Sequence, residues 1–322
     1  MKVLVTGATG FVGGHLVELL LARGDTVTAI IRDPARGKEL ARRGVRLIEG
    51  GLADSEPLQR AMVGQDVVYH LAGLVAARNE AEFLATNRDG TANLARAAAT
   101  AGVGRFLLVS SLAAAGPTTP DHPLAGNEPP APVTRYGRSK LAAEAVIRAS
   151  ALDWTIVRPP AVYGPGDREM LRIFKAAAFG FAPVFGDGSQ QLSLIFAPDL
   201  AEALVAAANS ASTAGGIYHP CHAEALTTRG LVGQIGTAVG RRPLVVGLPA
   251  PIARSFLRIT ETAARLAGRA TLLSVDKAAE FLAPAWLGDP TPLTRATGWA
   301  AKHDFPAGAS LTAAWYKQRG WL

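Results

Sequence analysis

The chain has 322 residues, 49% of them hydrophobic, so it can bury a substantial core as one large domain or as a domain with a smaller appended lobe. A single cysteine, Cys221, excludes an internal disulfide framework. No apolar run reaches the ~20 residues of a membrane span, and none forms a secretory signal. These observations favour a cytoplasmic protein. The net charge of +7 comes from scattered basic residues, and the densest group, between Arg32 and Arg46, has no interleaved aromatic residue, so we expect no nucleic-acid partner.

The first half of the chain alternates short apolar runs with longer alanine-rich stretches. Strands are predicted at residues 2–6, 26–31, 46–49, 67–71, 106–110 and 155–158, and helices near 11–23, 55–63, 80–101 and 136–151. The strand segments are continuously apolar, which is typical of strands covered by helices on both faces. The pattern predicts an α/β fold with a Rossmann-type, doubly wound parallel sheet.

The composition changes between Gly116 and Pro132, where six prolines prevent regular structure. We interpret this long loop as a substrate-side loop, the alternative being an excursion over the surface. After Gly164 the pattern becomes one of isolated helices, near 201–208, 228–239 and 252–266. We expect residues 1–164, with about 191–222, to form a dinucleotide-binding domain, and about 165–190 and 223–322 to form a smaller C-terminal substrate-binding lobe.

A glycine-rich turn follows the first predicted strand. Residues 3–13 read VLVTGATGFVG, which places three glycines between a buried strand and a helix, where backbone amides and the helix dipole hold a pyrophosphate. Within a βαβ unit this spacing indicates a dinucleotide site. The candidate cofactor-binding residues are Gly7, Thr9, Gly10, Phe11, Val12 and Gly13.

The end of the second strand bears on the choice of cofactor. An acidic residue there holds the ribose hydroxyls of NAD, whereas an arginine accommodates the 2′-phosphate of NADP. The sequence reads IIRDP, so that Arg32 stands at the strand end and Lys38 follows one turn later. This pattern favours NADP(H). In the alternative, with NAD(H), Asp33 binds the ribose and Arg32 stacks on the adenine or lies in solvent.

Tyr136 and Lys140, in YGRSK, stand four residues apart at the start of a predicted helix, so their side chains share one face. A free phenol has a pKa of about 10, and a nearby ammonium lowers the cost of the phenolate, which suits Tyr136 to proton transfer. Upstream, LVSSLAAAG places Ser110 and Ser111 at the carboxyl edge of the sheet. We assign orientation of the substrate oxygen to Ser111, with Ser110 as the alternative catalytic serine and a loop cap as the structural alternative.

These motifs together resemble the extended short-chain dehydrogenase/reductase family, which includes NAD(P)-dependent sugar-nucleotide epimerases and dehydratases, 3β-hydroxysteroid dehydrogenases and dihydroflavonol reductases. The likeness also rests on HLAG at 70–73, TNRDGTANL at 86–94, RPPAVYGPGD at 158–167 and GDGSQ at 186–190. The resemblance implies hydride transfer at the nicotinamide, contacted by Tyr136 and Lys140. It further implies that Leu71, Ala72 and Gly73 pass under the cofactor, that Asn87 supports its nicotinamide half, and that Pro159 to Val162 lie along the carboxamide. Pairing of the two long helices in a homodimer is another expectation from this likeness.

Two departures from the family pattern affect the ligands. The stretch GGLAD has Gly51 where many members use an aspartate for the adenine amino group, which leaves backbone near Leu52, or Asp54, for that contact. Sugar-nucleotide enzymes of the family often place an arginine and a histidine after GDG, and this chain has Leu192 and Phe196 there. A buried diphosphate without a basic partner is costly, so an apolar substrate is favoured.

The predicted function is therefore that of an NADP(H)-preferring ketoreductase or alcohol dehydrogenase acting on an apolar, small-molecule carbonyl or carbinol. The alternatives are a sugar-nucleotide epimerase or dehydratase with bound NAD, and a cofactor-binding regulatory or assembly protein without turnover. No metal is expected, because YHPCH at 218–222 has no usual zinc spacing. The resemblance instead places that segment in a strand.

Overall fold

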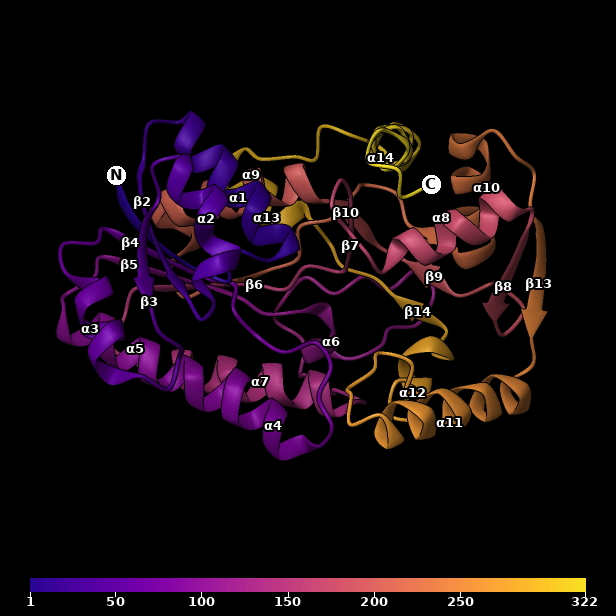
Figure 1. Cartoon of the computed structure of the whole chain (residues 1–322), viewed down its shortest axis with the longest axis horizontal. Helices are drawn as coiled ribbons and strands as arrows, with labels where there is room; N and C mark the ends of the chain where they lie inside the picture. The colour runs from indigo at the N-terminus through magenta and orange to yellow at the C-terminus, as the bar shows by residue number, and fades with distance from the viewer.

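The computed structural model describes all residues, 1–322, and its centre is a seven-stranded sheet in the order β11-β6-β5-β4-β1-β2-β3 (Figure 1). The strands are β1 (Lys2–Thr6), β2 (Thr26–Ile31), β3 (Arg46–Glu49), β4 (Val67–His70), β5 (Arg105–Val109), β6 (Trp154–Val157) and β11 (Ile217–Tyr218). Every neighbouring pair is parallel. The predicted doubly wound parallel sheet is thus confirmed, and its first six strands lie within one residue of their predicted bounds.

Helices cover both faces of the sheet, as Figure 1 shows. Alternate residues of β1 point to opposite faces, so that Val3 and Val5 join one buried cluster and Leu4 the other. The first cluster includes α1 (Phe11–Ala22), α2 (Pro34–Arg42), α9 (Ala197–Asn209) and α13 (Thr291–Thr297). The second includes α3 (Ser55–Met62), α5 (Gly90–Thr100) and α7 (Arg135–Arg148). The two-sided cover explains why the strand sequences are continuously apolar.

The helix predicted near residues 80–101 consists of three segments. It starts with α4 (Glu80–Leu84), passes through one π-helical turn at Ala85–Asp89 and continues as α5. Such turns change the face on which the following residues lie and occur often at functional sites. Here the π turn contains Asn87, whose side chain is buried.

Helix α2 is absent from the sequence prediction. Four of its nine residues are charged, Leu40 is its only large apolar residue and Gly37 lies in its interior, so the segment is too short to show an extended apolar repeat. The sequence did contain a signal for the start of this helix, an N-cap residue followed by proline. Asp33 accepts a hydrogen bond from the Ala35 backbone N–H, and Pro34 occupies the first helical position.

The rest of the chain forms small sheets and helices beside the main sheet, at the right of Figure 1. Strand β7 (Ala161–Tyr163) pairs with β10 (Leu194–Phe196), β8 (Phe181–Phe185) with β13 (Leu244–Leu248), and β9 (Gln191–Leu192) with both β12 (Leu226–Thr227) and β14 (Ala285–Trp286). The helices are α8 (Met170–Phe179), α10 (Thr228–Val239), α11 (Ala250–Leu266), α12 (Ala278–Phe281) and α14 (Phe305–Gln318). None of the helices in the structure has the length and apolar character that crossing a bilayer requires.

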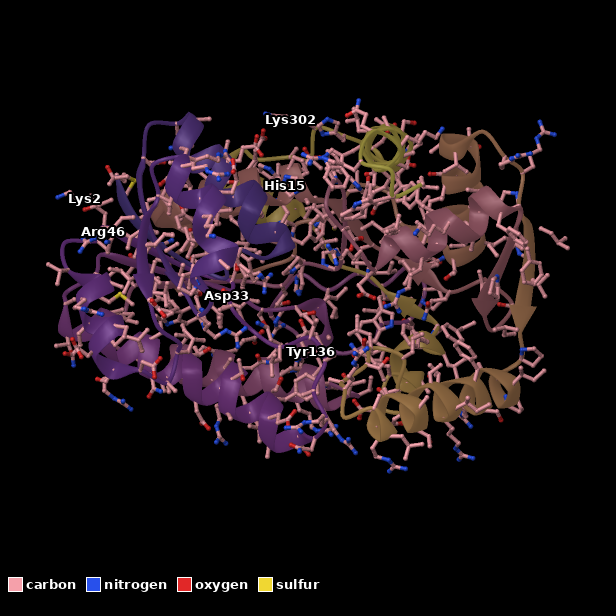
Figure 2. The ribbon with its side chains drawn as sticks, in the orientation of Figure 1. Lys2, His15, Asp33, Arg46, Tyr136 and Lys302 are labelled. Carbon is pink, nitrogen blue, oxygen red and sulfur yellow. The ribbon has the colours of Figure 1, made fainter.

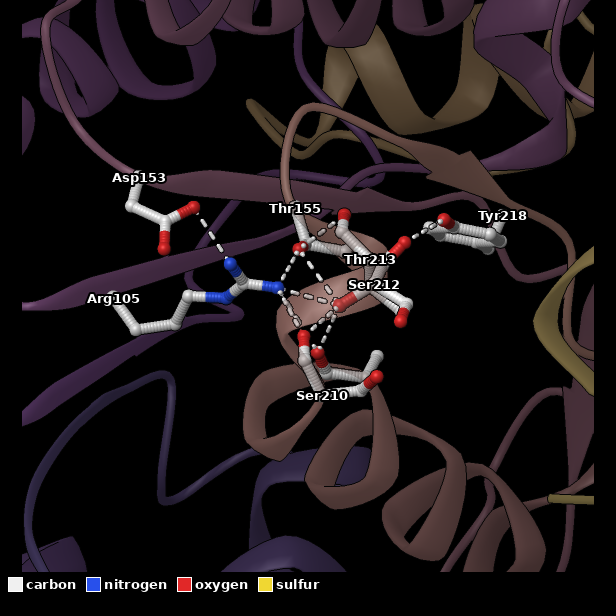
Figure 3. A network of polar contacts seen from close by, with 8 residues as sticks. Arg105, Asp153, Thr155, Ser210, Ser212, Thr213 and Tyr218 are labelled. Atoms are coloured by element: carbon white, nitrogen blue, oxygen red, sulfur yellow. Dashed lines mark hydrogen bonds and ion pairs between the residues drawn. The ribbon is translucent and has the colours of Figure 1, made fainter. Parts of the chain in front are cut away.

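A buried arginine ties the edge of the sheet to the end of α9 (Figure 3). One nitrogen of the Arg105 guanidinium bonds to the Asp153 carboxylate at 2.6 Å, and another bonds to the Thr155 hydroxyl at 2.8 Å and to the Ser210 carbonyl at 2.9 Å. Thr213, in the 3-10 turn Ala211–Thr213, completes the set. The network links the amino ends of β5 and β6 to the turn that leads into β11, at the edge of the sheet opposite to the one that Ser110 and Ser111 follow.

Candidate active site

The glycine-rich turn is tightly packed between β1, α1 and the segment after β4. Gly7 has a φ of +75°, and a Cβ there would lie 2.8 Å from the Ala72 nitrogen. A Cβ on Gly13 would lie 2.1 Å from the Gly7 carbonyl oxygen. Side chains at either position are therefore excluded, which lets the start of α1 approach the turn as closely as a pyrophosphate site requires.

An open cleft of about 1590 Å³ runs along this turn. Among the predicted cofactor-binding residues, it is lined by Gly7, Thr9, Gly10, Phe11, Val12, Gly13, Leu71, Gly73 and Val162. At the start of α1 the cleft wall consists of glycine backbone beside Thr9 and Phe11, which fits a dinucleotide with its pyrophosphate on the helix N-terminus. When bound, such a cofactor supplies or accepts hydride.

Asn87 holds the segment after β4 in place. Its side-chain oxygen accepts the Leu74 backbone N–H at 2.8 Å, and its amide nitrogen donates to the Leu74 carbonyl at 3.0 Å and to the Ser139 hydroxyl at 2.9 Å. Ala72 is tied to β1, because its N–H donates to the Thr6 hydroxyl at 3.2 Å. The structure therefore places Asn87 as a buried clamp on residues 72–74, beneath the cleft.

The basic residues after β2 differ in where they point. The guanidinium of Arg36 donates to the Thr9 carbonyl at 3.3 Å and lines the cleft, whereas Lys38 is exposed and does not line it. The stem of Arg32 extends toward Gly51, whose Cβ position would lie 3.8 Å from the Arg32 Cγ. Sequence reasoning missed Arg36, although it stands in the same basic group.

Asp33, the acidic alternative in this region, has a structural role. Its carboxylate accepts the Ala35 N–H at 2.9 Å as the N-cap of α2. Figure 2 shows its position among the side chains of this half of the molecule. A carboxylate held by its own helix is less free to accept both ribose hydroxyls.

The GGLAD turn after β3 is closed by its own side chain, Asp54. The Asp54 carboxylate accepts the Gly51 N–H at 2.6 Å, while the Leu52 side chain packs against Gly90 of α5. The Leu52 carbonyl accepts the Asn93 side-chain amide at 3.0 Å. Leu52 is therefore anchored to α5, and Asp54 is engaged within the turn.

Tyr136 and Lys140 lie one turn apart on α7, where Lys140 is buried and Tyr136 is partly buried. The Lys140 ammonium donates to the Val109 carbonyl at 2.7 Å and lies 3.6 Å from the Cβ position of Gly73. Burial lowers the pKa of Lys140 to about 8, and Glu144 acts in the opposite direction. Burial raises the pKa of Tyr136 to about 12, which the Ser111 hydroxyl opposes.

The two serines of the SS motif have different partners. The Ser110 hydroxyl donates to the Glu144 carboxylate at 2.5 Å, in a buried site where Arg158 also holds Glu144 through two hydrogen bonds of 2.9 and 2.6 Å. Ser111 caps the short helix α6 (Leu112–Ala115) by accepting the Ala113 N–H at 3.2 Å, and its hydroxyl influences Tyr136. Ser111 is thus both the loop cap and the serine beside the phenol.

Pro159 and the following strand complete this wall. The Pro159 carbonyl accepts the Leu112 N–H at 2.9 Å, so that Pro159 supports α6, and Val162 of β7 lines the cleft. The loop 116–132 contains no helix or strand and bonds at Thr118 to the Ala285 carbonyl, at 2.9 Å. The loop therefore runs between the sheet edge and the C-terminal part of the chain.

A segment from the C-terminal part of the chain packs over Tyr136, a contact that the sequence did not reveal. The Lys277 ammonium lies 4.6 Å from the centre of the Tyr136 ring and pairs with Glu280 at 2.6 Å. Glu280 also accepts the Thr134 hydroxyl at 2.5 Å, one residue before α7 begins. Figure 2 places Tyr136 beside this junction between α7 and the α11–α12 region.

Leu192 and Phe196 are packed rather than presented to a ligand. Phe196 is buried, with its ring centre 5.5 Å from that of Tyr163 and 4.9 Å from that of His303. Leu192 in β9 packs against the same cluster. His222 and Cys221 of YHPCH bond to the Tyr163 hydroxyl at 3.0 Å and the Gly288 carbonyl at 3.1 Å, respectively.

Comparison with known proteins agrees with this geometry. The model of the NAD dependent epimerase/dehydratase family matches residues 3–219. A ceramide reductase from Caulobacter vibrioides is 32% identical over 99% of this chain and 96% of its own length. A 2-alkyl-3-oxoalkanoate reductase from Stenotrophomonas maltophilia is 33% identical over 74% of this chain and 76% of its own.

Among solved structures, MoeE5 in complex with UDP-glucose and NAD has a TM-score of 0.80 at 26% identity, with 99% of each chain covered. The family match and the full-length relative confirm the resemblance found in the sequence. The chain belongs to the NAD dependent epimerase/dehydratase family, within the extended short-chain dehydrogenase/reductases, and is an NAD(P)-dependent enzyme of the oxidoreductase type.

Proposed function

We propose that the enzyme is an NADP(H)-preferring ketoreductase or alcohol dehydrogenase for an apolar carbonyl or carbinol. The observation that carries the proposal is the buried, apolar setting of Leu192 and Phe196, where a sugar-nucleotide enzyme would need cations for a diphosphate. Two relatives are named as reductases of a ceramide and of a 2-alkyl-3-oxoalkanoate, which supports an apolar substrate class.

In this proposal three side chains act on the substrate oxygen. A bound nicotinamide would supply the hydride for the carbonyl carbon during reduction, and the Tyr136 phenol would give its proton to the oxygen. Lys140, whose ammonium lies beside Gly73, stabilises the resulting phenolate, and Ser111 orients the oxygen. Tyr136→Phe should lower kcat by about 10² to 10⁴ without weakening NADPH binding. Unchanged turnover in that variant would remove the proposed role, and would favour a non-catalytic cofactor-binding protein.

The preference for NADP(H) rests on Arg32 and Arg36. Arg36 lines the cleft, the stem of Arg32 extends toward Gly51, and Asp33 is engaged in capping α2. A charge-assisted hydrogen bond to phosphate contributes about 1.5–3 kcal/mol, so Arg36→Ser should weaken NADPH binding by roughly 10- to 150-fold and leave NADH binding little changed.

Lys38→Ser is the matched control, because it removes one positive charge from the same helix without altering the cleft wall. Equilibrium binding of NADPH and NADH to the wild type and each variant decides the preference. Equal affinity of the wild type for both cofactors would refute it, and a larger loss in Lys38→Ser than in Arg36→Ser would return the phosphate contact to the position that the sequence favoured.

The second candidate is a sugar-nucleotide epimerase, which the likeness to MoeE5 with UDP-glucose and NAD supports. An epimerase returns its hydride to the substrate, so NAD would copurify with the protein and no net cofactor would be consumed. A UDP-sugar that raises the melting temperature would favour this candidate over the reductase.

We also propose that the protein is a homodimer formed through α4, α5 and α7. The oligomeric state can be measured on the same purified protein.

A further inference from the structure

Helix α11 lies at the rim of the C-terminal part of the chain, with α12 on its inner side (Figure 1). It is 17 residues long, yet only Ala253 and Leu257 are buried. These two residues stand four apart, so they define the single narrow face that packs on the protein. Most of the helix surface is therefore available to another molecule.

The exposed surface of α11 carries an apolar stripe. Ile252, Phe256, Ile259 and Leu266 follow helical spacing on one side, and their exposed fractions are 56%, 44%, 69% and 84%. Single exposed apolar residues are ordinary, but four aligned over four turns form a continuous surface that water solvates poorly. The stripe is distinct from the face formed by the two buried residues.

The charges of the same segment are mostly of one sign. Residues 250–269 contain four arginines and one glutamate. Arg258 and Arg265 stand seven residues apart and share one exposed side of the helix. Ser255 and Thr262 lie between that side and the apolar stripe. The glutamate, Glu261, accepts the Val275 backbone N–H at 2.9 Å and is thereby turned to its own chain.

We infer that α11 docks the protein on a lipid surface that bears anionic headgroups. An apolar stripe beside arginines on a helix that lies on the surface matches an interfacial helix, with the stripe at the acyl boundary and the guanidinium groups on lipid phosphates. Anionic lipid is favoured over a second copy of the chain, because two copies meeting at this helix would bring their arginines together.

The docking helix is coupled to the catalytic side of the molecule. The Thr260 hydroxyl donates to the Leu273 carbonyl at 2.7 Å, and Asp276 accepts the Arg135 N–H at 3.0 Å, directly before Tyr136. A lipid surface at α11 would thus lie beside the segment that covers Tyr136, the side from which we expect an apolar substrate to arrive. That consequence rests on the proposed function, whereas docking itself is measured without turnover, so the two can fail separately.

Flotation with phosphatidylcholine vesicles, with and without phosphatidylglycerol, tests the docking. The wild type should float with the anionic vesicles and much less with the neutral ones, and salt should weaken the binding. A basic residue near an anionic surface contributes about fivefold, so replacing Arg258 and Arg265 by serine should lower the partition coefficient about 25-fold. Ile259→Asp should abolish flotation.

The control pair is Arg46→Ser with Arg60→Ser, which removes the same charge from exposed positions on β3 and α3, outside the helices of the proposed homodimer. Leu311→Asp on α14, 49% exposed, is the apolar control. Both controls should float like the wild type, and all variants should bind NADPH, which shows that they are folded. Absence of flotation, or equal loss in the arginine control pair, would overturn the inference. The inference would also be overturned if the wild type bound no vesicles and instead formed a dimer that Ile259→Asp dissociates.

Discussion

The buried ammonium of Lys140 should make the stability of the enzyme depend on pH in a predictable direction. Burial lowers its pKa from 10.5 to about 8, and the side chain is only 5% exposed. Because the folded pKa is below the unfolded one, the unfolded chain binds this proton more tightly, and the contribution of Lys140 to the free energy of unfolding rises with pH between the two values. The two pKa values correspond to a rise of about 2 kcal/mol between about pH 8 and pH 10.

Urea unfolding of the wild type and of Lys140→Met, at a series of pH values, measures this contribution. The variant leaves the Val109 carbonyl without its donor, an offset that does not change with pH. Cys221, whose pKa burial raises to about 12, lowers stability at alkaline pH in both proteins, so its effect cancels in the difference. The wild type should gain about 2 kcal/mol relative to the variant across the window. If the free energies of unfolding of the wild type and the variant changed in parallel with pH, the argument that Lys140 is charged at a desolvated site would be refuted.

Gly13→Ala should weaken NADPH binding on the order of 10-fold or more, because its Cβ would meet a carbonyl oxygen at 2.1 Å, while Gly14→Ala, which meets nothing within 4 Å, should leave the binding constant unchanged. Equal effects of the two would contradict the packing account of the turn. Glu144→Gln should lower the free energy of unfolding by about 3 kcal/mol, because it leaves the buried Arg158 without its counter-charge. The control, Glu82→Gln in an exposed pair, should leave the melting temperature nearly unchanged, and a similar shift in both variants would show that burial of the ion pair does not matter.

Much of the main sheet could be predicted because its information is local. Each strand is a short apolar run and each covering helix follows within a few residues, so β1 to β6 were found to within a residue. Helix α2 was missed because it is short and Leu40 is its only large apolar residue, so that its Asp33–Pro34 start carried the clearest signal. The π turn around Asn87 was missed because helical periodicity predicts one continuous helix through that region.

The site was predictable where motifs position it and not where distant segments meet. The glycine spacing determines which backbone lines the cleft, and YGRSK places Tyr136 and Lys140 one turn apart on α7. Lys277 reaches the ring of Tyr136 from 141 residues further along the chain, and no pattern at either end indicates the contact. The selection of Arg36 rather than Lys38 for the cleft wall follows from the direction of α2, which was not predicted.

The charges buried at the carboxyl edge of the sheet explain why the Lys140 ammonium is suited to the proposed chemistry. Glu144 is held by Arg158 on one side and follows Lys140 by one turn, so the two cations share one anion and the site has an excess of positive charge. His70 and His219 add none, because burial lowers the pKa of each well below neutral, and Lys140 and Arg158 respectively act in the same direction. The excess charge thus lies at Lys140, where negative charge would form on Tyr136 during proton transfer.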